Sequence, residues 1–227
     1  MMTMFDIERS REIIMSIDDA KSVTQQRKPR RRKFYDMSFD YSMGGMPGYS
    51  LDNLGQVTLR PPSGQRGFPK YPEAPRILFD KDAGRLPPDL EQFHAYWLVS
   101  DRTKSVLQAV DPTGFIFVAC KVRIPGGDYD GPDYWLCDVI RVLDALDETQ
   151  SRLKISRRGE TGYLYSGEKH YSLAGGAELV FKDDIIGNMH VFRMAYQEPT
   201  VICDQVLKDA CKAAGLKGIK FRDASKL

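Results

Sequence analysis

Two apolar runs on either side of a short turn-rich segment constrain the fold of this chain more than any other feature. FIFVACKVRI at 115–124 and YWLCDVIRVL at 134–143 are rich in β-branched and aromatic residues, which favour strands. Between them, PGGDYDGPD at 125–133 contains three glycines and two prolines, residues that favour turns. The pattern predicts two neighbouring strands that pair in an antiparallel fashion.

Further helix and strand signals extend this pattern over the C-terminal half. Ser100 is a favourable N-cap for a helix that ends at Asp111-Pro112, and Asp204 is a favourable N-cap for a second helix that is followed by Gly215. Many strands with only two clear helices predict an α+β fold with a mainly antiparallel sheet. The additional short strands are predicted at 153–157, 177–181, 190–194, 200–203 and 218–221.

Residues 1–90 differ from the rest, because glycine and proline interrupt regular patterns there. SMGGMPGYS at 42–50 and RPPSGQRGFPKYP at 60–72 predict loops with one or two short strands. A short helix is predicted near 7–20. We therefore expect an irregular N-terminal segment or small subdomain, residues 1–90, packed on an α+β domain of residues 91–227.

The composition is that of an ordinary globular protein. Of 227 residues, 42% are hydrophobic and 28% are charged, and 33 basic against 31 acidic residues give a net charge of +2. These values exclude collagen-like, disordered and membrane-spanning classes. The N-terminus has charged residues where a signal peptide needs an apolar run, and the four cysteines form no CxxC pair. We therefore expect a cytoplasmic protein with reduced thiols and no membrane contact.

The sequence predicts that the protein is not an enzyme. It contains no GxSxG motif, no P-loop and no GxGxxG fingerprint. The three histidines are scattered: His94 and His190 are predicted to be packed or hydrogen-bonded in the core, and His170 is predicted to be exposed. No metal site and no cofactor are predicted, because metal binding needs His and Cys at close spacing. A hydrolase would require a polar pocket that brings distant histidines and carboxylates together.

The middle third of the chain is acidic, with 14 acidic and 8 basic residues between 71 and 150. Acidic groups steer a basic partner, and rigid aromatic rings supply buried contact area, so an acidic stretch with interleaved rings is a candidate protein-binding surface. The alternatives are a solvated hairpin tip for the loop and turn caps for the two later aspartates. The candidate residues are Asp128, Tyr129, Asp130, Asp133, Tyr134, Trp135, Asp144, Asp147 and Glu148.

A basic run at 27–33 supplies a different candidate function. Six cationic residues in seven positions, followed by two aromatic residues, are typical of phosphate-backbone binding by nucleic-acid-binding proteins. The alternatives are a solvated arm, or a strip that pairs with the acidic middle third. The candidate residues are Arg27, Lys28, Arg30, Arg31, Arg32 and Lys33.

Four segments in order carry a resemblance to a known family. They are YWLVSDRTKSVLQAVDPTGFIFVACKV at 96–122, DYWLCDVIRVLDALDETQS at 133–151, VFKDDIIGNMHVFRMA at 180–195 and VICDQVLKDACKAAGLKGIKF at 201–221. Together they resemble the polymorphic-toxin immunity family typified by a Myxococcus immunity protein, formerly a domain of unknown function. The resemblance covers about residues 96–221, and residues 1–90 align only loosely.

The resemblance implies an intracellular antidote that is encoded beside a secreted or contact-delivered toxin. Such proteins are not enzymes, and they act by binding the toxin and blocking or distorting its active site. Family members occur near several toxin types, nucleases among them, and an acidic surface would mimic the phosphate backbone in a nuclease groove. We therefore expect the VLDALD motif at 142–147 to be shared scaffolding and the loop 125–133 to select the toxin.

Overall fold

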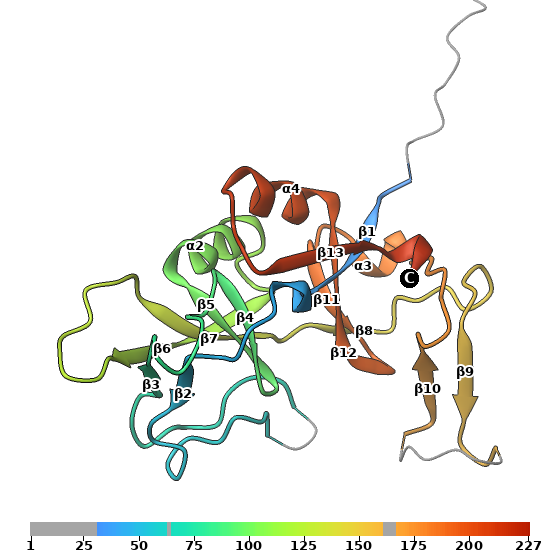
Figure 1. The fold of residues 1–227 in the computed structure, drawn as a ribbon. Helices are drawn as coiled ribbons and strands as arrows, with labels where there is room; N and C mark the ends of the chain where they lie inside the picture. The colour runs from blue at the N-terminus through green and yellow to red at the C-terminus, as the bar shows by residue number, and fades with distance from the viewer. Residues whose placement is uncertain (1–30, 63–64, 161–166) are drawn as a thin grey trace, which may run out of the picture. The chain divides into compact units, whose positions relative to one another are not determined.

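A computed structural model describes residues 31–62, 65–160 and 167–227, and the predicted helix near 7–20 lies outside them. The first of its two large sheets has six strands in the order β2-β3-β6-β7-β5-β4 (Figure 1). All neighbours in this sheet are antiparallel except β3 and β6. The strands are β2 (Tyr49–Leu51), β3 (Arg76–Phe79), β4 (Leu90–Phe93), β5 (Tyr96–Ser100), β6 (Phe115–Arg123) and β7 (Tyr134–Val139).

The second large sheet has five strands in the order β13-β1-β12-β11-β8. Its neighbours are antiparallel except β11 and β8. A separate antiparallel pair, β9 with β10, completes the strands of the described residues. The bounds are β1 (Phe34–Phe39), β8 (Val142–Leu143), β9 (Lys154–Arg157), β10 (Lys169–Ser172), β11 (Val191–Met194), β12 (Gln197–Asp204) and β13 (Ile219–Asp223).

The two predicted helices of the described residues begin at the predicted caps. The Ser100 side chain accepts a hydrogen bond from the Thr103 backbone N–H, and Asp204 accepts one from Leu207, so both caps are confirmed. Gly215 follows the second helix with φ of 65°, as a left-handed C-terminal glycine. The helices are α2 (Asp101–Val110), α3 (Asp183–Ile186) and α4 (Gln205–Ala213), with 3₁₀ turns η1 (Tyr41–Met43) and η2 (Ala224–Lys226). None of these described helices is long and apolar enough to span a membrane.

Alternation of side chains along the strands builds three cores. Along β5, Trp97 and Val99 enter a central core that both large sheets share with α2 and α4, whereas Leu98 enters a six-strand core on the other face of its sheet. Along β12, Cys203 enters the central core and Ile202 a five-strand core that also contains residues of 145–186. The four cysteines are free thiols, three of them fully buried.

The predicted fold class is confirmed, and most predicted strands are present. The strands at 115–124 and 134–143 pair in an antiparallel fashion, although the second is divided, because the chain leaves the six-stranded sheet after Val139 and joins the five-stranded sheet as β8. The predicted strand at 177–181 is wrong. Its alternate residues are buried, but its backbone forms isolated bridges, Glu178 with Arg152 and Phe181 with Leu146, in place of a continuous ladder with one strand.

Strands from before and after residue 90 share both large sheets. β1 lies between β12 and β13, and β3 pairs with β6. The N-terminal part therefore contributes a six-residue central strand, whose side chains Tyr35, Met37 and Phe39 enter the central core.

Candidate functional site

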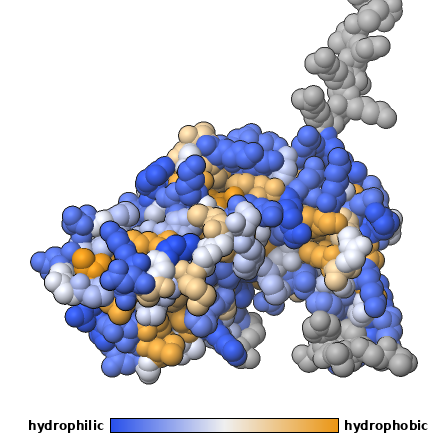
Figure 2. Space-filling model, viewed as in Figure 1, coloured by the Kyte–Doolittle hydropathy of each residue, from blue (hydrophilic) through white to orange (hydrophobic). Residues whose placement is uncertain are grey.

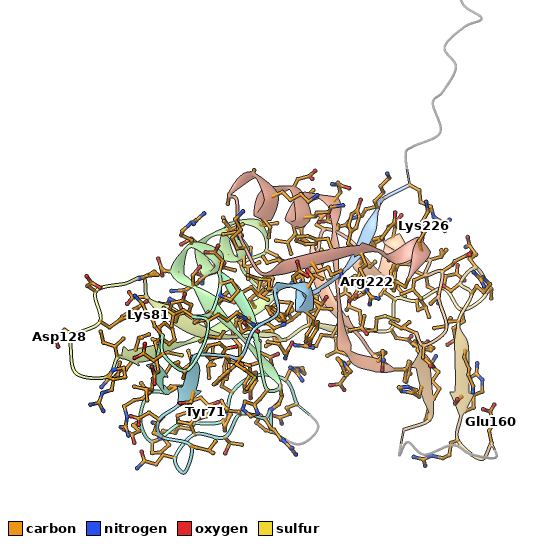
Figure 3. All side chains as sticks on the ribbon, in the orientation of Figure 1. Tyr71, Lys81, Asp128, Glu160, Arg222 and Lys226 are labelled. Carbon is orange, nitrogen blue, oxygen red and sulfur yellow. The ribbon has the colours of Figure 1, made fainter. Side chains whose placement is uncertain are left out.

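The loop 125–133 joins β6 to β7 and carries three of the predicted acidic residues. Asp128, Asp130 and Asp133 are exposed, and no hydrogen bond or ion pair within the described part of the chain engages their carboxylates. Figure 3 shows Asp128 at the outer end of this loop. The loop therefore presents negative charge that the rest of the described protein does not neutralise.

Tyr129 anchors this loop to the six-stranded sheet. Its ring packs edge-on against Phe79 with the ring centroids 5.5 Å apart, and its hydroxyl donates to the Pro132 carbonyl at 2.9 Å. Burial, together with the charges of Asp133 and Asp130, raises the pKa of the Tyr129 hydroxyl. The hydroxyl therefore remains protonated as a hydrogen-bond donor, and the acidic tip is held on a packed base.

The other two aromatic candidates are engaged inside the fold. Tyr134 is buried, packs on Phe79 and donates its hydroxyl to the Pro87 carbonyl at 3.0 Å. The Trp135 indole donates to Asp101 at 3.1 Å, and the Lys104 ammonium lies 3.2 Å from its ring centroid. These rings stabilise the hairpin and helix α2, and their partner-binding role stays a prediction.

The acidic residues at 144–148 lie in a turn that packs on the five-strand core. Asp147 accepts hydrogen bonds from the backbone N–H groups of Thr149 and Gln150, as in an Asx turn. Glu148 accepts from Lys169, from the Tyr171 hydroxyl at 2.8 Å and from Arg157 at 2.9 Å. Asp144 is about half exposed and lies 3.9 Å from the Lys169 ammonium.

The structure thus separates the predicted surface into two parts. The loop at 125–133 extends from the six-stranded sheet, whereas the turn at 144–148 contacts β9 and β10, on the opposite side of residues 32–227 in Figure 1. Of these two parts, only the loop has exposed carboxylates that no hydrogen bond or ion pair of the described residues engages.

Half of the basic run lies within the described residues. Arg32 donates to Asp204 at 2.8 Å and to the Gly187 carbonyl at 2.7 Å, and its guanidinium lies over the Phe34 ring. Arg31 and Lys33 are exposed. Arg27, Lys28 and Arg30 lie outside the described residues. Arg32 is thus already engaged within the fold. Nucleic-acid binding by the basic run stays a prediction.

The structure also shows the surroundings of two of the three histidines, His94 and His190. His94 is exposed in the turn between β4 and β5 with φ of 56°, so the prediction that it packs in the core is wrong. The turn needs a left-handed residue at this position, which points the side chain outward. The Nδ1 atom of His190 lies 2.8 Å from Asp204, which confirms the predicted hydrogen bond, although the side chain is 28% exposed and lies only partly in the core.

An exposed apolar loop at 41–46 was missed by the sequence analysis. Tyr41 is 71% exposed and Met46 is 76% exposed, and Met43 lies between them. Single exposed apolar residues are common, but three within six positions are typical of an interaction surface. The two methionines of SMGGMPGYS, each beside glycine or proline, were the available signal.

The base of this loop is held by backbone contacts. The Gly48 N–H donates to the Arg85 carbonyl at 2.7 Å, and the Arg85 side chain donates to the Gly44 carbonyl at 2.8 Å. A Cβ on Gly84 would lie 2.1 Å from the Met46 carbonyl oxygen, and one on Gly48 would lie 2.4 Å from that of Asp80. Only glycine fits at these two positions.

The face drawn in Figure 2 is mainly hydrophilic, with hydrophobic patches between the hydrophilic residues.

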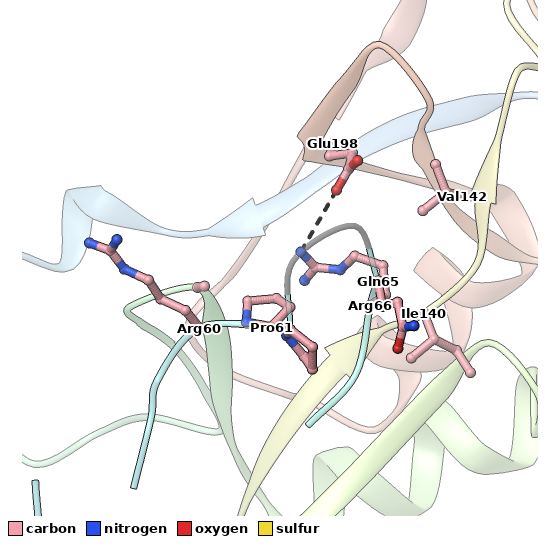
Figure 4. A pocket seen from close by; sticks show the side chains of 9 residues that line it. Arg60, Pro61, Gln65, Arg66, Ile140, Val142 and Glu198 are labelled. Atoms are coloured by element: carbon pink, nitrogen blue, oxygen red, sulfur yellow. Dashed lines mark ion pairs between the residues drawn. The ribbon is translucent and has the colours of Figure 1, made fainter. Parts of the chain in front are cut away.

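A pocket was also missed, because its residues come from four separate segments. Its volume is about 600 Å³, and it lies where residues 60–62 and 65–66 meet β8, β12 and the turn between β4 and β5 (Figure 4). Pro61, Ile140 and Val142 form apolar walls, and Arg66 and Glu198 supply opposite charges 4.0 Å apart.

Comparison with known proteins gives one family match. The model of the immunity protein family Imm11 matches residues 35–226, which is more of the chain than the sequence resemblance covered. A search of curated proteins finds no match.

Proposed function

Because the chain belongs to the Imm11 immunity protein family, we propose that it binds a cognate bacterial toxin and neutralises it by stoichiometric occlusion, without catalysis. The toxin is a secreted or contact-delivered protein encoded by an adjacent gene, and the protection takes place in the cytoplasm. This proposal requires a surface that a foreign protein can reach and that the fold does not already use.

The loop 125–133 is the proposed recognition surface. The supporting observation is that Asp128, Asp130 and Asp133 are exposed and unpaired among the described residues, on a loop whose base is fixed by Tyr129 and Phe79. A preorganised acidic loop attracts a basic partner over several ångströms and loses little conformational freedom on binding. A nuclease toxin has the required basic groove, since it must bind phosphates.

The exposed apolar loop 41–46 is proposed as a second contact. Charged loops set the association rate, whereas buried aromatic and methionine side chains supply much of the affinity. Tyr41 and Met46 are the most exposed large apolar side chains described. Their burial against the toxin would supply contact area that three carboxylates cannot.

The test is a charge reversal of the loop. A variant with Asp128→Lys, Asp130→Lys and Asp133→Lys is compared with a control that changes net charge equally, namely Glu168→Lys, Asp184→Lys and Asp209→Lys. All six positions are exposed. We expect the loop variant to bind the product of the adjacent toxin gene roughly 100-fold more weakly and to lose protection in a cell-survival assay, with the control close to wild type.

Circular dichroism establishes that each variant is folded. Unchanged protection by a folded loop variant rejects the loop as the recognition surface. Absence of binding by the wild-type protein rejects the toxin itself as the partner.

A further inference from the structure

The pocket beside Arg66 lies next to a buried ion cluster with an excess of positive charge. Asp138 is fully buried and accepts hydrogen bonds from Arg66, from Arg193 at 3.1 Å and from the Gly67 N–H at 2.7 Å. Two guanidinium groups therefore share one carboxylate. Burial and the nearby charge of Arg66 lower the pKa of Arg193, although Asp138 opposes this effect.

Arg66 is incompletely paired beside the pocket. Its Nε atom is buried and has no hydrogen-bond partner. Its Nη1 atom lies 4.0 Å from Glu198, which is too far for a hydrogen bond, and the Glu198 side chain is 54% exposed. Figure 4 shows the Arg66 guanidinium directed toward Glu198 across the pocket. Glu198 is thus a weak counter-ion that a better-placed anion can replace.

We infer that this pocket binds a small free carboxylate compound with a compact apolar body. A carboxylate can accept two N–H groups from a guanidinium and would offset the excess charge shared by Arg66 and Arg193. Pro61, Ile140 and Val142 would contact the apolar body. The volume of about 600 Å³ falls in the range of small-ligand sites, and Arg66 is only 13% exposed, which favours a small molecule over a protein surface. This inference does not depend on the proposed toxin.

Benzoate is the probe, and the neutral amide benzamide is its control. The full chain is titrated with each compound at constant ionic strength, and binding is followed by calorimetry and by NMR shifts. We expect saturable benzoate binding with a dissociation constant of about 1 mM, as is usual for so small a ligand, and no saturable benzamide binding.

Three variants locate the site. Glu198→Gln removes the competing carboxylate and should tighten benzoate binding by about two- to fivefold, a gain that structural damage would not produce. Glu178→Gln is the matched control, because Glu178 is 53% exposed and also pairs with an arginine, Arg152, but lies outside the pocket. Val142→Glu adds a negative charge to the wall and should weaken binding by more than about tenfold.

The inference is overturned by any of three results. These are an absence of saturable benzoate binding to wild type and Glu198→Gln, equal binding of benzamide, or the same effect from Glu178→Gln as from Glu198→Gln. Loss of binding in a folded Val142→Glu variant, together with tightening in Glu198→Gln, supports it.

Discussion

The two acidic stretches of the middle third, residues 128–133 and 144–148, are alike in sequence and differ in what their carboxylates contact. In the first, three carboxylates are exposed and unpaired within the described residues. In the second, Glu148 bonds to two cations and a tyrosine, and Asp147 bonds to the backbone of its own turn. An acidic stretch can therefore be either a candidate recognition surface or a structural turn. The two differ in whether lysine and arginine side chains lie within hydrogen-bonding distance of the carboxylates.

The largest effect on stability is expected at Glu148. Its side chain is 25% exposed, and its removal leaves the Tyr171 hydroxyl and the largely buried Lys169 ammonium without their acceptor. Glu148→Ala should lower the free energy of unfolding by about 2–3 kcal/mol, measured by urea denaturation. Asp130→Ala is the control for the first stretch. Similar destabilisation by both variants would remove the distinction between the stretches.

The contribution of Glu148 should also depend on pH. The hydrogen bond from Lys169, with a further one from Tyr171, lowers the pKa of Glu148 to about 2. Since this pKa lies below the value of about 4.3 in the unfolded chain, the stabilisation is complete above that value and is lost as the pH falls toward 2.

Unfolding free energies of wild type and Glu148→Gln, measured between pH 6 and 2, should therefore converge on acidification. A difference that stays constant over this range would show that the charge of Glu148 contributes nothing.

A smaller effect is expected at Asp147. Asp147→Ala removes the acceptor for the backbone N–H groups of Thr149 and Gln150, whereas Asp147→Asn retains a side-chain oxygen at that position. The alanine variant should melt below wild type but above Glu148→Ala, and the asparagine variant should recover much of the loss. Equal melting of the two Asp147 variants would contradict the turn contacts.

The smallest effect on stability is expected in the loop. Asp128→Asn, Asp130→Asn and Asp133→Asn together should change the unfolding free energy by less than about 0.5 kcal/mol, because these side chains have no partner among the described residues. The same triple variant should slow association with the toxin at low salt and approach wild type at high salt, as stopped-flow mixing would show. A marked loss of stability would mean that the loop supports the fold.

The sequence was informative for several features that short-range contacts decide, although the local pattern at 177–181 misled. The caps at Ser100 and Asp204, the left-handed Gly215 and the β6–β7 hairpin all depend on neighbouring residues, and all are confirmed. By contrast, the position of β1 between β12 and β13 depends on pairing between the two ends of the chain, which no local pattern encodes.

The same reasoning applies to the candidate site. The exposure of Asp128 follows from a turn-rich loop, so it could be predicted. Trp135 and Glu148 have partners in α2 and β10 that only the tertiary structure brings near. The pocket combines residues from four segments, and Asp138, which has no distinguishing sequence context, becomes the buried centre of the adjoining ion cluster.

The contacts at Gly48 and Gly84 have a consequence for how this protein can diversify. Because backbone meets backbone there, these two positions tolerate no side chain, whereas Met43 and Met46 are exposed at the tip of the loop. Amino-acid substitutions can therefore accumulate at the tip of the loop while Gly48 and Gly84 are kept. In the proposed toxin contact, exchanging only these outermost residues would change which partner fits, and the rest of the domain could stay as it is.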